Sequence, residues 1–277
     1  MAEDGEPHWV ALNEVSNPRA VALAVHGLNT NVAAIFADLG EALVEPQVLA
    51  FGLQLSGHRI DPQTRRAVPG ELSAHADFGR WTREVREAAS VLARRWPQQP
   101  RLGVGYSIGG AATLAAQAEA SPFQGVVGLA PAVAMTPLTR ALCRLNYALM
   151  KPFGLEGWAW RPSAVRAPYR ANDAIAANAL YTGEQAQQTF EAMDSAGLQA
   201  LRGRVTVLMR QRDGVVSARR VRAFFEQHAL DVEWRTLPER PDGAWSHEVF
   251  DRSTLGESWD TVMTAIQARL QRMGLED

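Results

Sequence analysis

Short apolar runs alternate with amphipathic helical segments along most of the 277 residues. Such alternation is typical of a parallel sheet that is covered by helices. The runs are continuous and rich in valine and leucine, as strands buried on both faces should be. We therefore expect an α/β fold with a mostly parallel central sheet flanked by helices. The expected strands are residues 21–25, 48–53, 102–106, 126–129, 205–209 and 232–237, with residues 9–15 as a candidate antiparallel edge strand.

Several segments between these runs have the periodicity of helices. In residues 81–96, apolar side chains recur every three to four positions, and arginines and glutamates fill the other face. Pro97 follows this segment and would end the helix. Similar patterns predict helices over residues 217–228 and 259–270.

Residues 136–194 interrupt the alternation, because they contain no strand-like run. Helices are expected at residues 138–150, 174–180 and 184–193. The segment directly follows the run at 126–129, so it should lie over the carboxyl ends of the strands, where such sheets bind ligands. We expect residues 136–194 to form a helical lid, inserted after the sixth strand of a core that comprises residues 1–135 and 195–277.

The overall composition argues against several classes of protein. Hydrophobic residues make up 47% and charged residues 21%, which is ordinary for a globular chain. The net charge of −2 provides no field toward nucleic acid or an anionic membrane. The arginines are scattered among acidic residues and form no patch with aromatic side chains. We expect no nucleic-acid partner.

The cysteine content and the hydrophobic profile bear on localisation. Cys143 is the only cysteine, so the chain cannot form an internal disulfide. The N-terminal residues are acidic, unlike a secretory signal. No apolar run approaches the roughly 18 residues that span a bilayer. We expect a soluble cytoplasmic protein without an integral membrane segment, and the oligomeric state stays open.

The strongest chemical signal is the pentapeptide Gly-Tyr-Ser-Ile-Gly at residues 105–109, between an apolar run and a helix rich in small residues. A serine on a sharp strand-to-helix turn has a strained backbone, and small residues two positions away avoid collisions. The turn exposes the hydroxyl, and the helix N-terminus offers N–H groups to developing negative charge. Ser107 is the candidate nucleophile. The alternative is a tight glycine turn with an incidental serine. A dinucleotide-binding loop is excluded, because Ile108 stands where its third glycine would be needed.

A second motif, His-Gly-Leu-Asn, follows the run at residues 21–25. A tetrahedral intermediate needs two preorganised N–H donors, and a loop after an adjacent strand can supply one of them. The expected donors are the backbone N–H groups of Leu28 and Ile108. His26 precedes Ser107, whereas a nucleophile of this kind is followed in the chain by its acid and then its histidine. We therefore expect His26 to hold the loop by hydrogen bonding.

This order requires an acid at the end of a late strand and a histidine after the next strand. Asp213 follows the run at residues 205–209, and His247 lies in the loop after the run at 232–237. His247 would accept the proton of Ser107 and return it to the leaving group. Asp213 would fix the tautomer of His247 and stabilise the imidazolium.

Each of these residues has an alternative interpretation. Asp213 could be a turn residue, and His247 could be an ordinary histidine in a surface loop. Other acids fit the role less well, because Asp242 lies in a Pro-Asp-Gly turn and Asp231 begins a strand at its wrong end. Three roles in the required order are harder to obtain by accident than any one of them.

Four segments carry a resemblance to a known family: HGLN from residue 26, GYSIGG from 105, RQRDGVV from 210 and WSHEVF from 245. Together they resemble the α/β-hydrolase superfamily, and within it the small carboxylesterases and monoacylglycerol lipases. The Gly-His-Arg at 57–59 resembles a loop usually written GHG, with Arg59 in place of the last glycine. The resemblance covers about residues 21–270. It implies ester hydrolysis through an acyl-serine intermediate without a cofactor, and no metal-ligand spacing is visible.

The lid segment is rich in apolar side chains that could line an acyl pocket or form its own small core. They are Leu142, Leu145, Tyr147, Leu149, Met150, Phe153, Trp158 and Trp160. The candidate substrate contacts are Leu28, Tyr106, Leu142, Tyr147, Trp158 and Val215. The same segment holds Arg140, Arg144, Arg161, Arg166 and Arg170, which could attract an anionic substrate, although a solvated face is the favoured interpretation.

The expected partner is a small-molecule substrate, a short- to medium-chain acyl ester or a monoglyceride. Thioesterases, C–C bond hydrolases and acyltransferases use the same triad, so they remain alternatives. Dehalogenases and epoxide hydrolases of this fold carry an aspartate where Ser107 stands. A non-catalytic ligand-binding protein is the alternative from a different class, and such proteins often lose a member of the triad that is present here.

Overall fold

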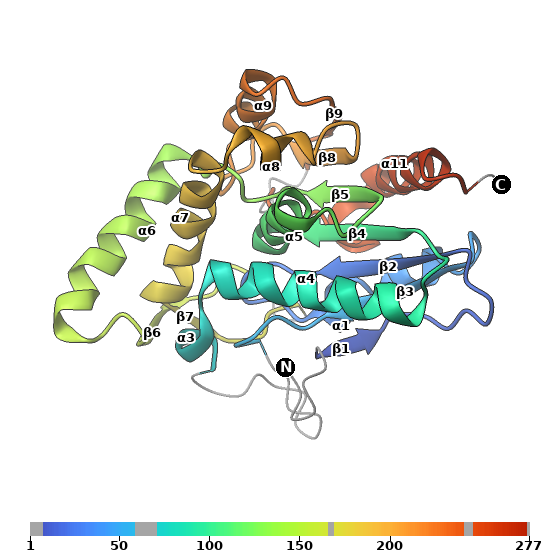
Figure 1. Ribbon diagram of the computed structural model, residues 1–277. Coiled ribbons are helices and arrows are strands. Elements are labelled where there is room, and N and C mark those ends of the chain that lie inside the picture. Colours follow the sequence, from blue (N-terminus) through green and yellow to red (C-terminus); the bar gives the residue numbers. More distant parts are fainter. Residues whose placement is uncertain (1–7, 59–70, 166–168, 241–245, 276–277) are drawn as a thin grey trace.

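The computed structural model describes residues 8–58, 71–165, 169–240 and 246–275, which form an α/β architecture (Figure 1). Within these residues, a seven-stranded sheet has the order β1-β3-β2-β4-β5-β8-β9. β1 is antiparallel to β3, and all other neighbours are parallel, so the predicted mostly parallel sheet is confirmed. The strands of this sheet are β1 (Trp9–Ala11), β2 (Ala20–Val25), β3 (Val48–Leu53), β4 (Arg101–Tyr106), β5 (Gly125–Leu129), β8 (Val205–Arg210) and β9 (Val232–Leu237).

Helices cover both faces of the sheet, which explains why β2, β5 and β8 are buried along their whole length. α4 and α5 lie on one face, and α11 lies on the other (Figure 1). Outside residues 136–194, the helices are α1 (Val32–Ile35), α2 (Ala37–Ala42), α3 (Glu71–His75), α4 (Phe78–Arg95), α5 (Ser107–Ala120), α8 (Ser195–Gln199), α9 (Ala218–Gln227), α10 (Arg252–Leu255), the short 3-10 helix η2 (Gly256–Ser258) and α11 (Trp259–Arg272). No helix of the described residues has the length and apolar character needed to cross a bilayer.

Two of the helices predicted from periodicity begin at capping residues that the sequence supplies. The Asp77 side chain accepts a hydrogen bond from the N–H of Arg80 at the start of α4. The Ser217 hydroxyl caps α9 in the same way through the N–H of Arg220. The predicted helices outside the lid segment are present as α4, α9 and α11, and the predicted helix rich in small residues is α5.

The edge strand is shorter than expected, since it ends at Ala11 and not at residue 15. The Asn13 side chain explains this limit, because it replaces ladder hydrogen bonds with its own. Its Nδ2 donates to the carbonyl oxygens of Gly40 and Val48, and its Oδ1 accepts from the N–H of Ala50. An asparagine that satisfies the backbone of neighbouring elements in this way ends the strand locally.

Residues 136–194 lie beyond the carboxyl ends of the sheet strands (Figure 1). Their elements are α6 (Pro137–Met150), the 3-10 helix η1 (Lys151–Phe153), β6 (Ala159–Pro162), β7 (Ala174–Ala176) and α7 (Ala177–Glu191). The prediction of a strandless segment is wrong, because β6 and β7 pair in antiparallel fashion. Pairing also takes residues 174–176 out of the expected helix, and the remainder joins the next predicted helix in α7.

The position of this segment also needs a correction. In the described part of the chain it follows β5, the fifth strand, and not a sixth. The difference arises because only one short strand, β1, precedes β2 among the described residues. Its attachment to the run at residues 126–129 is as expected.

Candidate active site

Ser107 lies at the junction of β4 and α5, where the chain turns sharply out of the sheet. Its φ angle is +53°, in the left-handed region that costs side-chain-bearing residues free energy. A Cβ atom on Gly109 would overlap the carbonyl oxygen of His26, and one on Gly105 would lie 2.5 Å from the Cα of Gly110. The two glycines of the motif are therefore required by close backbone contacts, and the strained turn presents the Ser107 hydroxyl at the carboxyl end of β4.

Three side chains that are distant in the chain form a continuous hydrogen-bonded series. The Nε2 of His247 lies 2.8 Å from the Oγ of Ser107, and its Nδ1 lies 2.7 Å from the Oδ2 of Asp213. All three residues are buried. Asp213 follows β8, and His247 lies in the segment between β9 and α10. The structure thus brings together the serine, histidine and acid that the sequence order nominates.

The environment of Asp213 keeps its carboxylate charged. Burial alone would raise its pKa, but the neighbouring His247 and the N–H groups of Val216 and Val215 hold the pKa below its usual value. The two N–H groups donate to Oδ1 at 2.9 Å and 2.8 Å, which leaves Oδ2 for the imidazole. An ionised, fixed acceptor on Nδ1 favours the tautomer whose Nε2 can accept a proton from Ser107.

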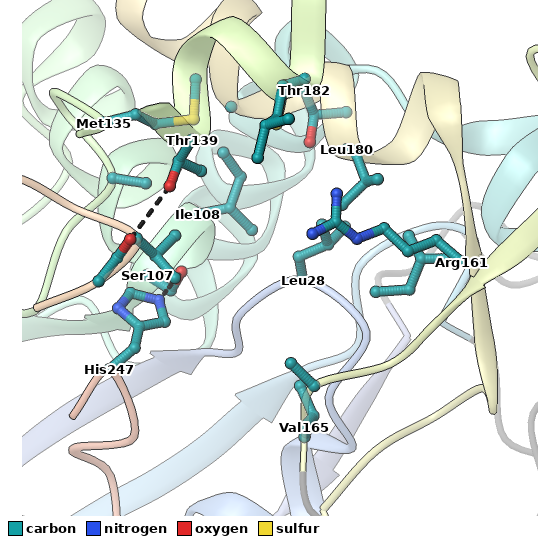
Figure 2. Close-up of a pocket in the computed structure, with 18 of the residues that line it drawn as sticks. Leu28, Ser107, Ile108, Met135, Thr139, Arg161, Val165, Leu180, Thr182 and His247 are labelled. Atoms are coloured by element: carbon teal, nitrogen blue, oxygen red, sulfur yellow. Dashed lines mark hydrogen bonds between the residues drawn. The ribbon is translucent and has the colours of Figure 1, made fainter. Parts of the chain in front are cut away.

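Two backbone N–H groups of residues that border Ser107 have no hydrogen-bond acceptor within the described residues. Ile108 is the second residue of α5, so its N–H has no intrahelical acceptor. The N–H of Leu28 donates no hydrogen bond within the described residues. Both residues line the cavity that contains Ser107 and His247 (Figure 2). One free N–H at the start of a helix and one on the neighbouring loop are the kind of donors that an oxyanion requires.

The loop that carries Leu28 is held by two buried histidines. The Nε2 of His26 accepts a hydrogen bond from the N–H of Leu55 at 3.1 Å, and the Nε2 of His58 accepts one from the N–H of Asn29 at 2.9 Å. Burial lowers the pKa of His26 to about 4 and the pKa of His58 well below its usual value. Neutral rings are required, because a protonated Nε2 could not accept these bonds. His26 therefore holds the loop, as expected.

Arg210, the last residue of β8, supports the segment around His247, and sequence reasoning missed it. Its buried guanidinium donates to the carbonyl oxygens of Ser246 and Glu248 at 3.2 Å and 2.9 Å. It also donates to the carbonyl oxygens of Pro238 and Thr254. The available signal was an arginine at the end of a mostly apolar strand, since a buried arginine requires a set of buried acceptors.

A cavity of about 300 Å³ opens at Ser107 and His247 (Figure 2). Four of the predicted substrate contacts line it: Leu28, Tyr106, Leu142 and Val215. Sequence reasoning missed further lining residues, which come from the segment that leads into α6, from α6 itself, from β6 and β7 and from α7. Examples are Met135, Thr139, Ile175, Leu180 and Thr182. Thr139 is anchored by a 3.0 Å hydrogen bond from its hydroxyl to the carbonyl oxygen of Gly214.

Two predicted contacts, Tyr147 and Trp158, do not line this cavity. The ring of Tyr147 stacks on that of Tyr181 of α7, with 4.2 Å between the centroids and 12° between the planes. This stacking fixes the side chain between α6 and α7. The Trp158 side chain is 62% exposed. Leu145, Leu149 and Phe153 are exposed as well. Most of the apolar residues expected in the lid segment therefore neither line the cavity nor form a core of their own.

Some sequence-predicted positions lie outside the described residues. They are Arg59 of the Gly-His-Arg segment, Arg166 and the side chain of Trp160.

Solved structures share the fold of this chain at low sequence identity. One from work on the metagenome-derived lipolytic enzymes LipS and LipT has a TM-score of 0.69 and 16% identity, covering 96% of this chain and 98% of that chain. The monoglyceride lipase of Saccharomyces cerevisiae has a TM-score of 0.69 and 16% identity over 95% and 91% of the two chains. A carboxyl esterase from Bacillus coagulans has a TM-score of 0.65 and 12% identity over 97% and 96%.

No protein with a curated description matches the chain significantly in sequence. A family model does match it: Hydrolase_4, described as serine aminopeptidase, S33, aligns with residues 16–241. This range includes Ser107 and Asp213 and ends shortly before His247. Because the match spans most of the chain and the fold agrees, the chain belongs to the Hydrolase_4 (serine aminopeptidase, S33) family of α/β-hydrolases.

Proposed function

We propose that this protein is a serine hydrolase that cleaves carboxylic esters through an acyl-enzyme intermediate. The observation that carries the proposal is the hydrogen-bonded series from Ser107 through His247 to Asp213, at 2.8 Å and 2.7 Å. It lies at the end of a cavity that is lined mainly by apolar side chains. Membership of a hydrolase family supports the same reaction class.

The proposed mechanism assigns one step to each group. His247 takes the proton of Ser107 as the hydroxyl attacks the ester carbonyl carbon, and then donates it to the leaving alkoxide. The N–H groups of Leu28 and Ile108 stabilise the oxyanion of the tetrahedral intermediate. Asp213 stabilises the imidazolium that forms between these steps. A water molecule, activated by His247, then hydrolyses the acyl-Ser107 ester and restores the serine.

The cavity favours an ester over the substrate in the family description. An aminopeptidase substrate carries an α-ammonium group, which needs an anionic or carbonyl-rich partner. No aspartate or glutamate is among the described residues that line the cavity, and Arg161 there would repel a cation. Lipolytic, monoglyceride lipase and carboxyl esterase structures are similar to this chain, which supports a short- to medium-chain acyl ester or a monoglyceride as substrate.

We further propose that residues 136–194 act as a lid on a core of residues 1–135 and 195–277. The segment lies beyond the carboxyl ends of the strands (Figure 1) and supplies Leu142, Arg161 and Leu180 to the cavity wall. A lid in this position excludes water from the acyl group and contributes to the choice of substrate.

Labelling with a fluorophosphonate probe tests the mechanism. The wild-type protein should label at Ser107 and hydrolyse para-nitrophenyl esters, with a maximum along a series of increasing chain length. Ser107→Ala should abolish labelling and lower kcat/KM by ~10³-fold or more. Ser90→Ala, on the exposed face of α4, is the matched control and should leave both unchanged.

The alternatives predict different results in the same assays. A non-catalytic ligand-binding protein would neither label nor turn over. An aminopeptidase would cleave amino-acid para-nitroanilides faster than esters. A thioesterase, C–C bond hydrolase or acyltransferase would label at Ser107 but would prefer acyl thioesters, β-diketones or an alcohol acceptor. If the folded wild-type protein does not label with the probe, the proposal is overturned.

A further inference from the structure

Arg161 places a positive charge in the wall of the candidate active-site cavity. It belongs to β6, in the lid segment, and Figure 2 shows its guanidinium pointing from that strand toward Leu28 and Leu180. In this view Arg161 lies on the right, and Ser107 and His247 lie on the left. Among the described lining residues, Arg161 is the one arginine or lysine.

The guanidinium of Arg161 has no protein counter-charge in the described part of the chain. No ion pair or side-chain hydrogen bond joins it to another described residue. Two other arginines of the same segment are paired: Arg140 binds Glu184 and Glu191, and Arg170 binds Asp173. A half-buried guanidinium carries five N–H donors, and such a group is stabilised when an anion binds to it.

The charge of Arg161 lies close enough to a buried side chain of the cavity wall to affect its pKa. Cys143, on the same wall, is buried, and burial raises the pKa of its thiol to about 11. The positive charge of Arg161 opposes this rise, so its field reaches a buried group that borders the substrate space.

The backbone at Arg161 is irregular in a way that redirects side chains. In the pairing of β6 with β7, Ala159 lies opposite Ala176, but Arg161 lies opposite Ile175, so β6 carries an extra residue between these positions. A bulge of this kind bends a strand and changes the direction of its side chains, and bulges are common beside active sites. This irregularity accompanies the orientation of Arg161 into the cavity.

We propose that Arg161 is a specificity-determining residue that binds a carboxylate of the substrate. The inference rests on the proposed ester hydrolysis and names its substrate class: an ester in which a short apolar chain links the scissile carbonyl to an anionic group. The apolar residues Leu28, Ile108 and Leu180 would contact this chain between Ser107 and Arg161. A planar guanidinium suits a carboxylate, which it can bind through two parallel hydrogen bonds.

The test compares substrates that differ in one terminal group. The mono-para-nitrophenyl ester of adipic acid carries a carboxylate, its adipamate analogue carries a neutral amide, and the hexanoate carries a methyl group. We expect the wild-type protein to prefer the adipate in kcat/KM. Arg161→Gln should lower the adipate-to-hexanoate ratio by about 10- to 100-fold, mainly through the KM of the adipate. High salt should reduce the wild-type preference.

Two further variants separate charge from packing. Arg161→Lys keeps a positive charge and should retain part of the preference. Arg161→Glu should reverse it, so that para-nitrophenyl ε-aminocaproate, with a terminal ammonium, becomes better than the adipate. The matched control is Arg144→Gln, on an exposed part of α6 that does not line the cavity, and it should leave the ratio unchanged.

The outcomes separate this inference from the proposed function. If the wild type neither labels with the fluorophosphonate nor cleaves any of these esters, the proposed function fails. If it labels and cleaves hexanoate but the ratio is the same in wild type, Arg161→Gln and Arg161→Glu, the assignment of Arg161 is overturned and the hydrolase stands. Labelling of Ser107 in each variant verifies that the site is assembled.

Discussion

The carbonyl oxygen of Glu248 accepts a 2.9 Å hydrogen bond from the Nη1 of Arg210, and the same nitrogen binds the carbonyl oxygen of Ser246 at 3.2 Å. His247 lies between these two residues in the chain. One buried guanidinium from the end of β8 therefore fixes the backbone on both sides of the candidate base. These hydrogen bonds hold the segment that carries the imidazole between Ser107 and Asp213.

We predict that Arg210→Met lowers kcat/KM by about 10²-fold, since a small displacement of a catalytic group costs this much. The melting temperature should also fall, because four buried or partly buried carbonyl groups lose a donor. If Arg210 only stabilised the fold, its replacement would not slow the labelling of protein that is folded. The rate of fluorophosphonate labelling, measured well below the melting temperature, reports on the activation of Ser107 and distinguishes the two roles.

Arg269→Met is the matched control for this prediction. Arg269 is 2% exposed and binds the carbonyl oxygen of Gly203 and the hydroxyl of Thr206, near the opposite end of β8 from Arg210. This variant should lose stability but label at close to the wild-type rate when folded. Equal labelling rates for the two variants would refute a positioning role for Arg210.

The sequence predicted the features that depend on periodicity and order along the chain. The parallel strands follow from continuous apolar runs, and the location of Asp213 and His247 follows from their places after β8 and β9. These residues lie within hydrogen-bonding distance of each other, and their catalytic roles stay predictions. The sheet order itself and the mutual approach of its loops come only from the folded chain.

Other features leave little trace in the sequence. The partners of Arg210 are backbone carbonyls, which any residue provides, so no motif marks them. When a helix carries apolar residues on more than one side, the sequence does not show which side packs against another helix. On α6, Leu142 lines the cavity whereas Tyr147 stacks on Tyr181, and only the packing against α7 decides between these orientations.

Asp213→Asn should lower kcat by about 10⁴-fold while the fold is retained. The Oδ1 atom can still accept the N–H groups of Val215 and Val216, so the turn should persist. The amide nitrogen would replace the anionic acceptor at Nδ1 of His247 and favour the wrong tautomer. Steady-state kinetics and the melting temperature measure the two effects. A decrease of less than tenfold would show that Asp213 does not act as the acid of the triad.

The backbone of Ser107 predicts an unusual order of stability among its variants. At φ +53°, a residue with a Cβ is strained by about 1–2 kcal/mol, and glycine is not. Ser107→Gly should therefore have a larger free energy of unfolding than Ser107→Ala, by about 1 kcal/mol, and both should be inactive. Urea denaturation gives the difference. At Ser90, which is exposed and lies in the middle of α4, the order should reverse: the alanine variant should be more stable than the glycine variant by about 1 kcal/mol.

The buried pair His26 and His58 predicts a loss of stability in mild acid. Their ring centroids lie 4.5 Å apart, and each ring accepts a hydrogen bond from a backbone N–H at Nε2. His26 has a pKa of about 4 in the folded protein, against 6.5 for a free histidine. Between these values the unfolded chain binds more protons, so the free energy of unfolding falls as the pH decreases. His26 contributes about 3 kcal/mol to this fall, which is complete near its folded pKa, and none above about pH 7.

A variant that cannot titrate separates this effect from that of the carboxylates. His26→Asn should be less stable than the wild type at neutral pH, because an amide fills the space of the ring poorly. Its free energy of unfolding should, however, decline less steeply from about pH 7 toward pH 4, so the two urea-derived curves should converge. His58 keeps part of the slope in the variant, since its pKa is lowered in the same direction. Parallel curves, or a His26 resonance that titrates near 6.5 by NMR, would show that the loop carrying Leu28 tolerates a charged imidazole.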